Sequence, residues 1–385
     1  MNVAKRNTYL VITLLFLLFF QACTYIPKPK DFRVGKRLDL KTVTAILESP
    51  RREKRLRFAN LSGLDLSGLD FSRMDLSGAY LYATNFENTN LSHCILNAVD
   101  LSYATFRNAN LSEATLRSAN MTQTRFIDTN AHLADMKNAT LRYAFIINSN
   151  FESVNLDSAK LEMITISDSN LVGAHMLATS FDGALIEKSN FRFSSIHRSD
   201  LTRIQFHESV FQGASLSGSN LSRSDFRNSD LADVDLSHAV AKEANFTHSN
   251  LTGAIMENTN FTASVFSSAQ LIQANLRNAI FTEGVFEQTN LNFADLTGAR
   301  MAKIRAPRTN FENAILSQTD LSRAILDESR FDNAILFASS FKKAYLEGAS
   351  FKKADLRQSD FTGADLDDAD FTDAQNLDLA TGLQK

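Results

Sequence analysis

Residues 59–63 read Ala-Asn-Leu-Ser-Gly, and residues 364–368, near the other end of the chain, read Ala-Asp-Leu-Asp-Asp. One five-residue frame connects the two stretches without an insertion. Every fifth residue from Leu61 to Phe371, 63 consecutive positions called centres here, is apolar. Nearly all of them are Leu, Phe, Ile or Met, and the three exceptions are Ala131, Ala241 and Ala306. The residue two before a centre is usually small, and the residue between them is often Asn or Asp.

A period of five residues fits neither an α-helix, whose period is about 3.6, nor a flat strand, whose period is 2. It fits a chain that turns a corner every five residues, with the centre and the small residue pointing inward and the other three positions pointing outward. One such coil cannot bury its centres alone, so successive coils must stack.

A second period of 20 residues predicts four sides per coil, because like side chains recur every fourth centre. One such row of centres contains no Phe at all and runs from Leu76 to Leu356. A parallel row carries Phe, then three Ile, then Phe again from position 206. We therefore expect side chains of one kind to stack in columns. The residues that we predict to stack in the core are Leu61, Phe86, Phe106, Phe126, Phe206, Phe226, Phe246, Phe266, Leu316 and Leu336.

The pattern A(D/N)LXX resembles the pentapeptide-repeat family. That resemblance implies an all-β fold, a right-handed quadrilateral parallel β-helix, over residues 58–373. We expect about 16 coils there, and at a spacing of about 4.8 Å they make a rod of about 75 Å.

The N-terminus, residues 1–23, has the order of a targeting segment. Lys5 and Arg6 precede the apolar run Leu10–Phe20, whose 11 residues fall short of the roughly 20 that span a bilayer but are typical of a secretory signal. The following residues, Phe20-Gln21-Ala22-Cys23, are similar to a bacterial lipoprotein lipobox, which implies lipidation of Cys23. Phe20 and Gln21 depart from that pattern, so an uncleaved membrane anchor stays open. Thr24 in place of Asp implies the outer membrane or periplasm rather than inner-membrane retention.

Residues 24–57 form a basic connection between that segment and the repeats, with a net charge of +7, whereas residues 58–385 carry −12. Apolar residues at helical spacing over residues 39–48, with Asp39 as N-cap and Pro50 after the end, predict a short helix that caps the first coil. The basic run 51–57 indicates either contact with an anionic lipid surface or nucleic acid, or a solvated linker.

Three local features need their own interpretation. Cys94 occupies the small position of the repeat, so we interpret it as a core residue and not as a reactive thiol. Pro307, beside the small centre Ala306, predicts a local bulge or bend. Residues 374–385 lose the frame and form a C-terminal cap or tail, in which we expect Leu377, Leu379 and Leu383 to cover the last coil.

Motifs for catalysis and for ligand binding are absent from the sequence. The seven His are scattered without the spacing of a zinc site, and there is no nucleophile elbow, phosphate loop or dinucleotide fingerprint. Two Cys are too few for a disulfide framework. We therefore predict no enzyme, no cofactor, no metal and no small-molecule substrate. Exposed aromatic residues are the remaining candidates for contact, and they are Tyr80, Tyr82, Tyr103, Tyr143, Phe145, Phe193, Phe293, Phe337 and Tyr345.

Several functions stay open at this point. The regular repeat and the N-terminal address favour a membrane-anchored envelope lipoprotein of bacterial origin that presents a rigid rod to an unidentified protein partner. One alternative is a secreted effector that acts at membranes, as some family members do. Another is DNA mimicry, by which members of the family bind DNA gyrase. The secretion signal would separate the chain from a topoisomerase, and we expect no nucleic acid as a partner.

Overall fold

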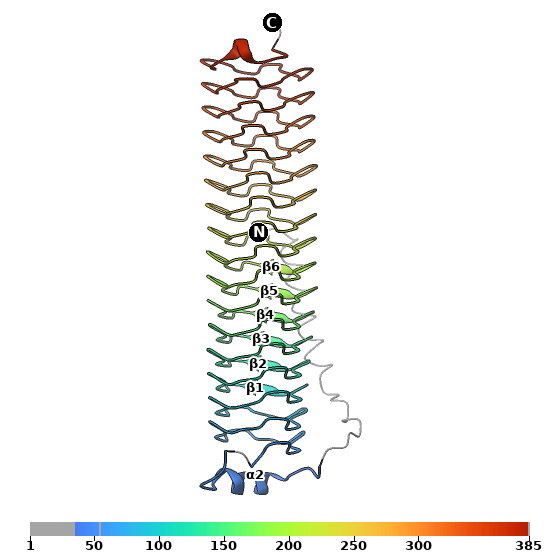
Figure 1. The fold of residues 1–385 in the computed structure, drawn as a ribbon, viewed down its shortest axis with the longest axis vertical. Helices are drawn as coiled ribbons and strands as arrows, with labels where there is room; N and C mark the ends of the chain where they lie inside the picture. Colours follow the sequence, from blue (N-terminus) through green and yellow to red (C-terminus); the bar gives the residue numbers. More distant parts are fainter. Residues whose placement is uncertain (1–34, 54, 384–385) are drawn as a thin grey trace, which may run out of the picture.

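The computed structural model describes residues 35–53 and 55–383, and within them the chain forms a parallel β-solenoid shaped as a rod (Figure 1). Parallel bridges join residues 20 apart at every fifth position, from Asn60 with Tyr80 to Asp355 with Gln375. A coil of 20 residues with a bridge at every fifth residue has four sides. The all-β, four-sided solenoid expected from the sequence is therefore confirmed.

One side of the rod carries a regular sheet over six successive coils, whereas elsewhere the coils meet at single bridges. The six strands are parallel and lie in chain order, with Phe106 opposite Phe126. They are β1 (Thr105–Arg107), β2 (Arg125–Ile127), β3 (Phe145–Ile147), β4 (Thr165–Ser167), β5 (Leu185–Glu187) and β6 (Gln205–His207).

The corners explain the outward positions of the repeat. The residue two after a centre has a positive φ, as in Gly63 (60°) and Asn88 (55°). Its N–H donates to the following coil, and the Gly63 N–H lies 2.7 Å from the Tyr82 carbonyl oxygen. The Asn or Asp before a centre accepts from the N–H two residues on, as Asp70 does from Ser72 at 2.9 Å. That turn is the reason for the frequent Asn and Asp.

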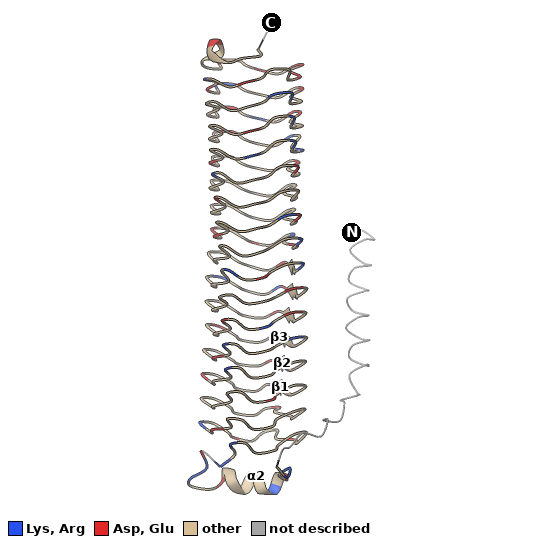
Figure 2. Cartoon of the chain, turned by 45° about the vertical axis from the view of Figure 1, so that its right-hand side comes forward, with Lys and Arg blue, Asp and Glu red and all other residues tan. Residues whose placement is uncertain are grey.

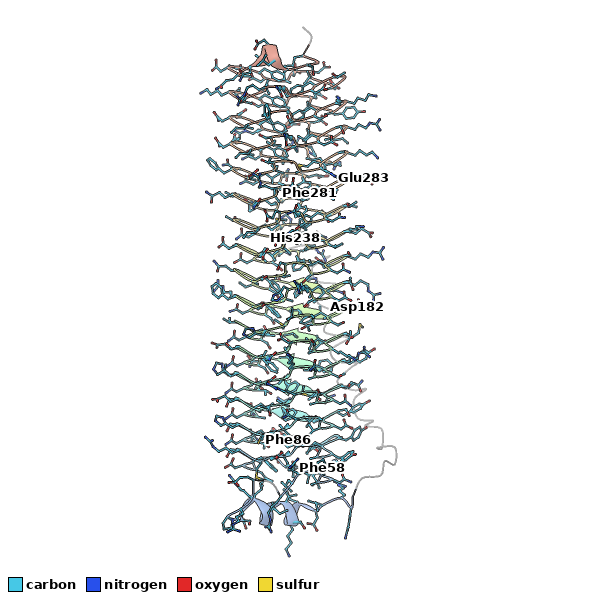
Figure 3. The ribbon with its side chains drawn as sticks, in the orientation of Figure 1. Phe58, Phe86, Asp182, His238, Phe281 and Glu283 are labelled. Carbon is cyan, nitrogen blue, oxygen red and sulfur yellow. The ribbon has the colours of Figure 1, made fainter. Side chains whose placement is uncertain are left out.

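The centres form a continuous core (Figure 3, in which Phe86 and Phe281 lie inside the rod and Asp182 and Glu283 at its edge). Phe106 stacks on Phe86 with ring centroids 5.0 Å apart and planes at 3°. Every residue singled out above for core stacking has a relative exposure of 1% or less: Leu61, Phe86, Phe106, Phe126, Phe206, Phe226, Phe246, Phe266, Leu316 and Leu336.

The N-terminal end of the rod is covered by the helix α2 (Leu40–Leu47), as expected (Figure 1). Asp39 caps it by accepting from the Thr42 N–H at 2.8 Å. Val43 is fully buried against the core. No helix of the described chain has the length and apolar composition needed to cross a bilayer.

In the last coil, at the C-terminal end of the rod, the repeat contains one extra residue. Asp360 bridges Thr381, a separation of 21, and the short 3-10 helix η1 (Leu377–Leu379) accommodates the difference. Of the three leucines expected to cover the last coil, Leu383 packs against the core. Leu377 and Leu379 do not, and they are 41% and 52% exposed.

The bulge predicted at Pro307 is wrong. Arg305 bridges Ile325 in the ordinary register, and the Ala306 N–H donates to the Ile325 carbonyl at 2.8 Å. Pro307 takes the first corner position, where the N–H makes none of the backbone-to-backbone bonds between coils and where the fixed φ of Pro suits a turn. Ala306 is fully buried, so the core continues through this coil.

Candidate interaction surface

The inside of the rod offers no site for chemistry in the part of the chain that the structure describes. No three His, Cys, Asp or Glu side chains there are grouped to hold a metal ion. Cys94 is buried, its Sγ lies 2.7 Å from the Phe71 carbonyl oxygen, and burial raises the pKa of its thiol to about 12. Cys23, predicted to be lipidated, lies outside the described residues. A functional site must therefore be sought on the outer surface.

The outer face of the sheet carries an apolar patch that we call the outer-sheet patch. Within one coil, Tyr143 at the corner is followed by Phe145 and Ile147, the two outward residues of β3. Apolar side chains continue it in the neighbouring coils. The patch consists of Ile127, Tyr143, Phe145, Ile147, Met163 and Leu185.

Parallel register brings these side chains together. Ile127 lies opposite Ile147, and Thr165 separates Phe145 from Leu185 in the same outward column. Tyr143 and Met163, 20 residues apart at the same corner, are 50% and 51% exposed. Apolar side chains thus recur over four successive coils of this side and are partly open to solvent.

The side of the rod that starts at Asp70 provides the contrast. Its outward column consists of hydrogen-bonded polar side chains, and Asn90 Nδ2 donates to Asp70 Oδ1 at 3.1 Å. Asn170 Nδ2 likewise donates to Asn150 Oδ1 at 3.1 Å. The column runs Asp70, Asn90, Asn110, Asn130, Asn150 and Asn170. These amides bind one another, whereas the outer-sheet patch has apolar surface left for a partner.

Ion pairs border the patch on the corner side. The Arg142 guanidinium donates to both oxygens of Glu162, each at 2.9 Å, and this contact lowers the pKa of Glu162 despite partial burial. Arg107 lies 3.8 Å from Asp128 on the other side. An apolar centre with a charged border is the usual anatomy of a protein interface.

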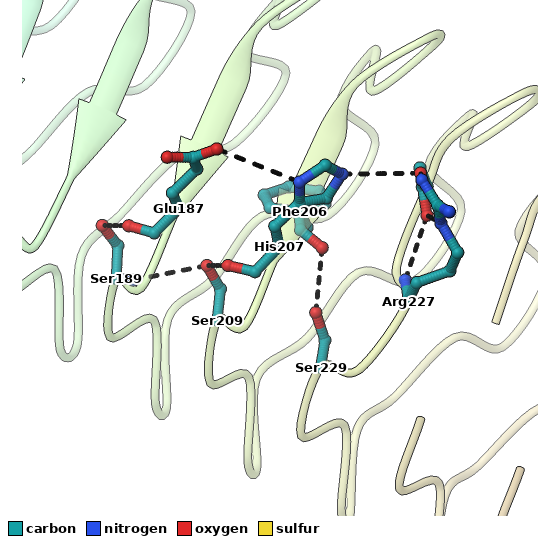
Figure 4. Close-up of polar contacts among 8 residues, drawn as sticks. Glu187, Ser189, Phe206, His207, Ser209, Arg227 and Ser229 are labelled. Atoms are coloured by element: carbon teal, nitrogen blue, oxygen red, sulfur yellow. Dashed lines mark hydrogen bonds and ion pairs between the residues drawn. The ribbon is translucent and has the colours of Figure 1, made fainter. Parts of the chain in front are cut away.

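A polar network closes the patch at its C-terminal border (Figure 4). His207 lies between two carboxylates, with Nδ1 3.9 Å from Glu187 and Nε2 3.5 Å from Asp225. Arg227 donates from Nε to Asp225 Oδ1 at 2.9 Å and from Nη2 to Oδ2 at 2.6 Å. Burial disfavours the charged form of Asp225, yet the contacts from His207 and Arg227 outweigh it and hold its pKa well below the ordinary value.

Beneath the sheet a column of hydroxyl groups supports these outer residues (Figure 4). At most corners the N–H of the small residue donates to the centre three residues before, as Ala104 does to Leu101 at 3.0 Å. Under the sheet it donates instead to a hydroxyl of the next coil. Ser149 N–H donates to Ser169 Oγ at 3.1 Å, and Ser189 N–H to Ser209 Oγ at 3.3 Å.

Sequence reasoning found only part of this surface. It marked Tyr143 and Phe145 as outward aromatic residues. Because the search was restricted to aromatic side chains, it missed Ile127, Ile147, Met163 and Leu185. The available signal was an apolar residue at both outward positions that flank a centre, as at 145 and 147.

The fold and this surface define a solenoid protein whose coils are built from five-residue units. Comparison with protein families matches "Pentapeptide repeats" in eight copies. With overlapping copies merged, the match covers residues 55–92, 94–130, 134–173, 189–304 and 308–374. The chain belongs to the pentapeptide-repeat family, whose members are structural and protein-interaction modules.

Solved structures of related solenoids match parts of the chain, whereas comparison with curated proteins gives no match. QnrB1, a plasmid-mediated fluoroquinolone resistance protein, is 21% identical over 47% of this chain and 84% of its own, with a TM-score of 0.31. HetL of Nostoc sp. strain PCC 7120, involved in regulating heterocyst differentiation, is 22% identical over 75% and 98%, with a TM-score of 0.22. A pentapeptide repeat protein of the Arabidopsis thaliana thylakoid lumen is 29% identical over 27% and 68%, with a TM-score of 0.15.

Proposed function

We propose that this chain is a bacterial envelope lipoprotein, anchored through Cys23, whose rod binds a protein partner at the outer-sheet patch. The observation that carries the proposal is the patch itself, a group of six apolar side chains on the outer face of the sheet that is bordered by ion pairs. The leader, with Lys5, Arg6 and the apolar run Leu10–Phe20 before Cys23, supports the anchor.

The size of the patch limits the kind of contact. Strands lie about 4.8 Å apart, so the six-stranded sheet is about 25 Å long. A standard interface buries about 800 Å² and involves about 20–30 residues on each partner, whereas the patch has six side chains. The partner therefore also contacts the charged border, including the Arg142–Glu162 pair and the network around His207.

Variants at the position before a centre test the patch without disturbing the fold, because Asn is an ordinary residue there. Phe145→Asn with Leu185→Asn removes apolar surface from the patch. Ile315→Asn with Ile335→Asn is the matched control, since these two residues bridge each other on another side of the rod and are 36% and 40% exposed.

The measurement is co-purification of tagged full-length protein from detergent-solubilised membranes. We expect a protein that is retained by the wild type and by the Ile315/Ile335 control and lost from the Phe145/Leu185 variant. Equal retention by all three, or equal loss from both variants, contradicts binding at the patch.

The anchor is tested separately by metabolic labelling with palmitate. We expect labelled wild-type protein in the envelope fraction and unlabelled Cys23→Ala protein. Unlabelled wild type that stays in the membrane indicates an uncleaved anchor, and unlabelled wild type in the cytosol overturns the envelope proposal and returns DNA mimicry to consideration.

A further inference from the structure

The two ends of the rod carry opposite charge (Figure 2). At the N-terminal end, the described residues of 35–57 comprise seven Lys or Arg and three Asp or Glu. At the other end, residues 355–383 comprise eight Asp and one Arg. Positive and negative charge are therefore separated along the axis of the rod. A molecule with charges separated in this way orients in the field of a charged surface.

The basic end is built on α2 and the loop after it. Arg52 and Arg57 pair with Asp70 and Asp75 of the neighbouring coil. Within the described part of the chain, five other cations form no ion pair. We call them the end cations, and they are Lys36, Arg37, Lys41, Arg51 and Arg55.

The end of the rod that carries the end cations also exposes an apolar residue. α2 lies across the end of the rod and turns Val43 to the core, while Leu40 in its first turn is 45% exposed (Figure 1). Lys41 and Ala45 are also exposed. A helix that lies flat, with cations beside an exposed apolar side chain, is the arrangement by which proteins bind the interfacial region of an anionic bilayer.

The length of chain between Cys23 and the rod favours lipid among the partners that a basic surface can bind. Residues 24–34 connect Cys23 to the described chain, and 11 residues span at most about 40 Å. Resting on the anchor proposed above, the basic end cannot lie farther than that from the membrane. The acidic end is separated from it by the length of the rod. Of the two ends, the basic one is therefore held near the lipid surface.

We propose that the N-terminal end of the rod docks on anionic lipid headgroups through the end cations and Leu40, so that the rod stands on the membrane with its acidic end directed away. Each basic residue near an anionic surface increases binding roughly fivefold. Docking of this kind weakens as the salt concentration rises. It also fixes the height of the outer-sheet patch above the membrane.

The test uses the full-length lipidated protein with an environment-sensitive fluorophore on Ala45→Cys. Lipidated Cys23 and buried Cys94 leave residue 45 as the labelling site. The labelled protein is added to vesicles of phosphatidylcholine alone or mixed with phosphatidylglycerol. We expect enhanced emission with the anionic vesicles, reversal by high salt, and loss of most of the enhancement in Lys41→Gln/Arg51→Gln/Arg55→Gln.

Arg323→Gln/Lys343→Gln/Lys353→Gln is the matched control, because these exposed cations also lie outside any ion pair among the described residues. It should keep the full enhancement. Equal emission with both vesicle types, or equal loss in both triple variants, overturns docking. Enhancement that follows protein concentration in the absence of vesicles shows head-to-tail association of copies instead and also overturns it.

Sedimentation of the same samples separates this proposal from the anchor. Protein that sediments with both vesicle types but shows no change at residue 45 is anchored without docking. Protein that fails to sediment with phosphatidylcholine vesicles contradicts the anchor itself, whatever the emission shows.

Discussion

Ser169 Oγ accepts a hydrogen bond from the backbone N–H of Ser149, one coil earlier, at 3.1 Å. Both residues are almost fully buried. The Ser149 N–H lacks the turn bond that the small residue makes at most corners, and the hydroxyl of the next coil takes its place, as it also does for Thr179 and Ser199 outside the sheet. The Ser and Thr of this column therefore act as acceptors for the sheet.

Ser169→Ala should lower the free energy of unfolding by about 1–3 kcal/mol, because it leaves a buried N–H without an acceptor. Ser249→Ala is the control. The Ser249 N–H donates to the Phe246 carbonyl oxygen of its own turn at 3.1 Å, and removal of the Ser249 hydroxyl leaves no backbone N–H without an acceptor. Urea unfolding followed by circular dichroism measures both. Equal losses would contradict the acceptor role.

Phe106→Ala should cost about 3–5 kcal/mol, because a fully buried ring is lost between Phe86 and Phe126 and the narrow coil collapses poorly around the cavity. Phe293→Ala, at a corner where the ring is 57% exposed, should cost far less. Hydrogen exchange read by mass spectrometry locates the loss. Since each coil contacts only its neighbours, faster exchange should centre on residues 86–126. An equal increase in exchange along the whole rod would contradict the expectation that the stacked ring stabilises only the neighbouring coils.

Gly213 illustrates a close approach between coils. It has a φ of +67°, and a Cβ there would lie 2.8 Å from the ring of Phe193 in the coil before. Gly213→Ala should cost more than Gly68→Ala, which has a similar φ of +72° but open space around the added carbon. The difference in unfolding free energy, of the order of 1 kcal/mol, should vanish when Phe193→Ala is introduced as well. Persistence of the difference in that background would exclude the ring as its cause.

Asp225 predicts a dependence of stability on pH. Its folded pKa is lowered, so its contribution is complete above an unfolded value of about 4 and is lost as the pH falls below it. Because the group is partly solvated, the loss should be of the order of 1 kcal/mol. The urea midpoint of the wild type should fall more between about pH 6 and pH 3 than that of Asp225→Asn. Identical shifts in the two proteins would exclude this carboxylate as a contributor.

The buried thiol of Cys94 should react only when the protein unfolds, so it can report on unfolding. Burial raises its pKa to about 12, so in a Cys23→Ala background the native protein should not react with a thiol reagent at neutral pH. Urea should release one reactive thiol per chain. Adding Ser92→Cys, at a corner in the same coil, should restore rapid reaction without denaturant. Rapid modification of Cys94 in the native state would contradict its burial.

Much of this architecture follows from local rules. Leu61 and its successors are apolar at a period that suits only a corner every five residues, and the recurrence of Phe86, Phe106 and Phe126 predicts columns. The error at Pro307 came from treating Pro as a break, although the corner position needs no N–H. The exposure of Leu377 and Leu379 depends on a single residue by which the last coil leaves the frame.

The coil, the number of its sides and the identity of its core could all be predicted from the residues alone, because the centre of every unit must be buried wherever it lies. The position of a specific surface became visible only in the folded chain. Phe145, Ile147 and Leu185 form one patch because parallel register stacks residues 20 apart on one side. Ser169 is an acceptor because the Ser149 N–H of the coil before it has no partner in its own turn. Such relations join residues of different coils, and the five-residue pattern does not state them.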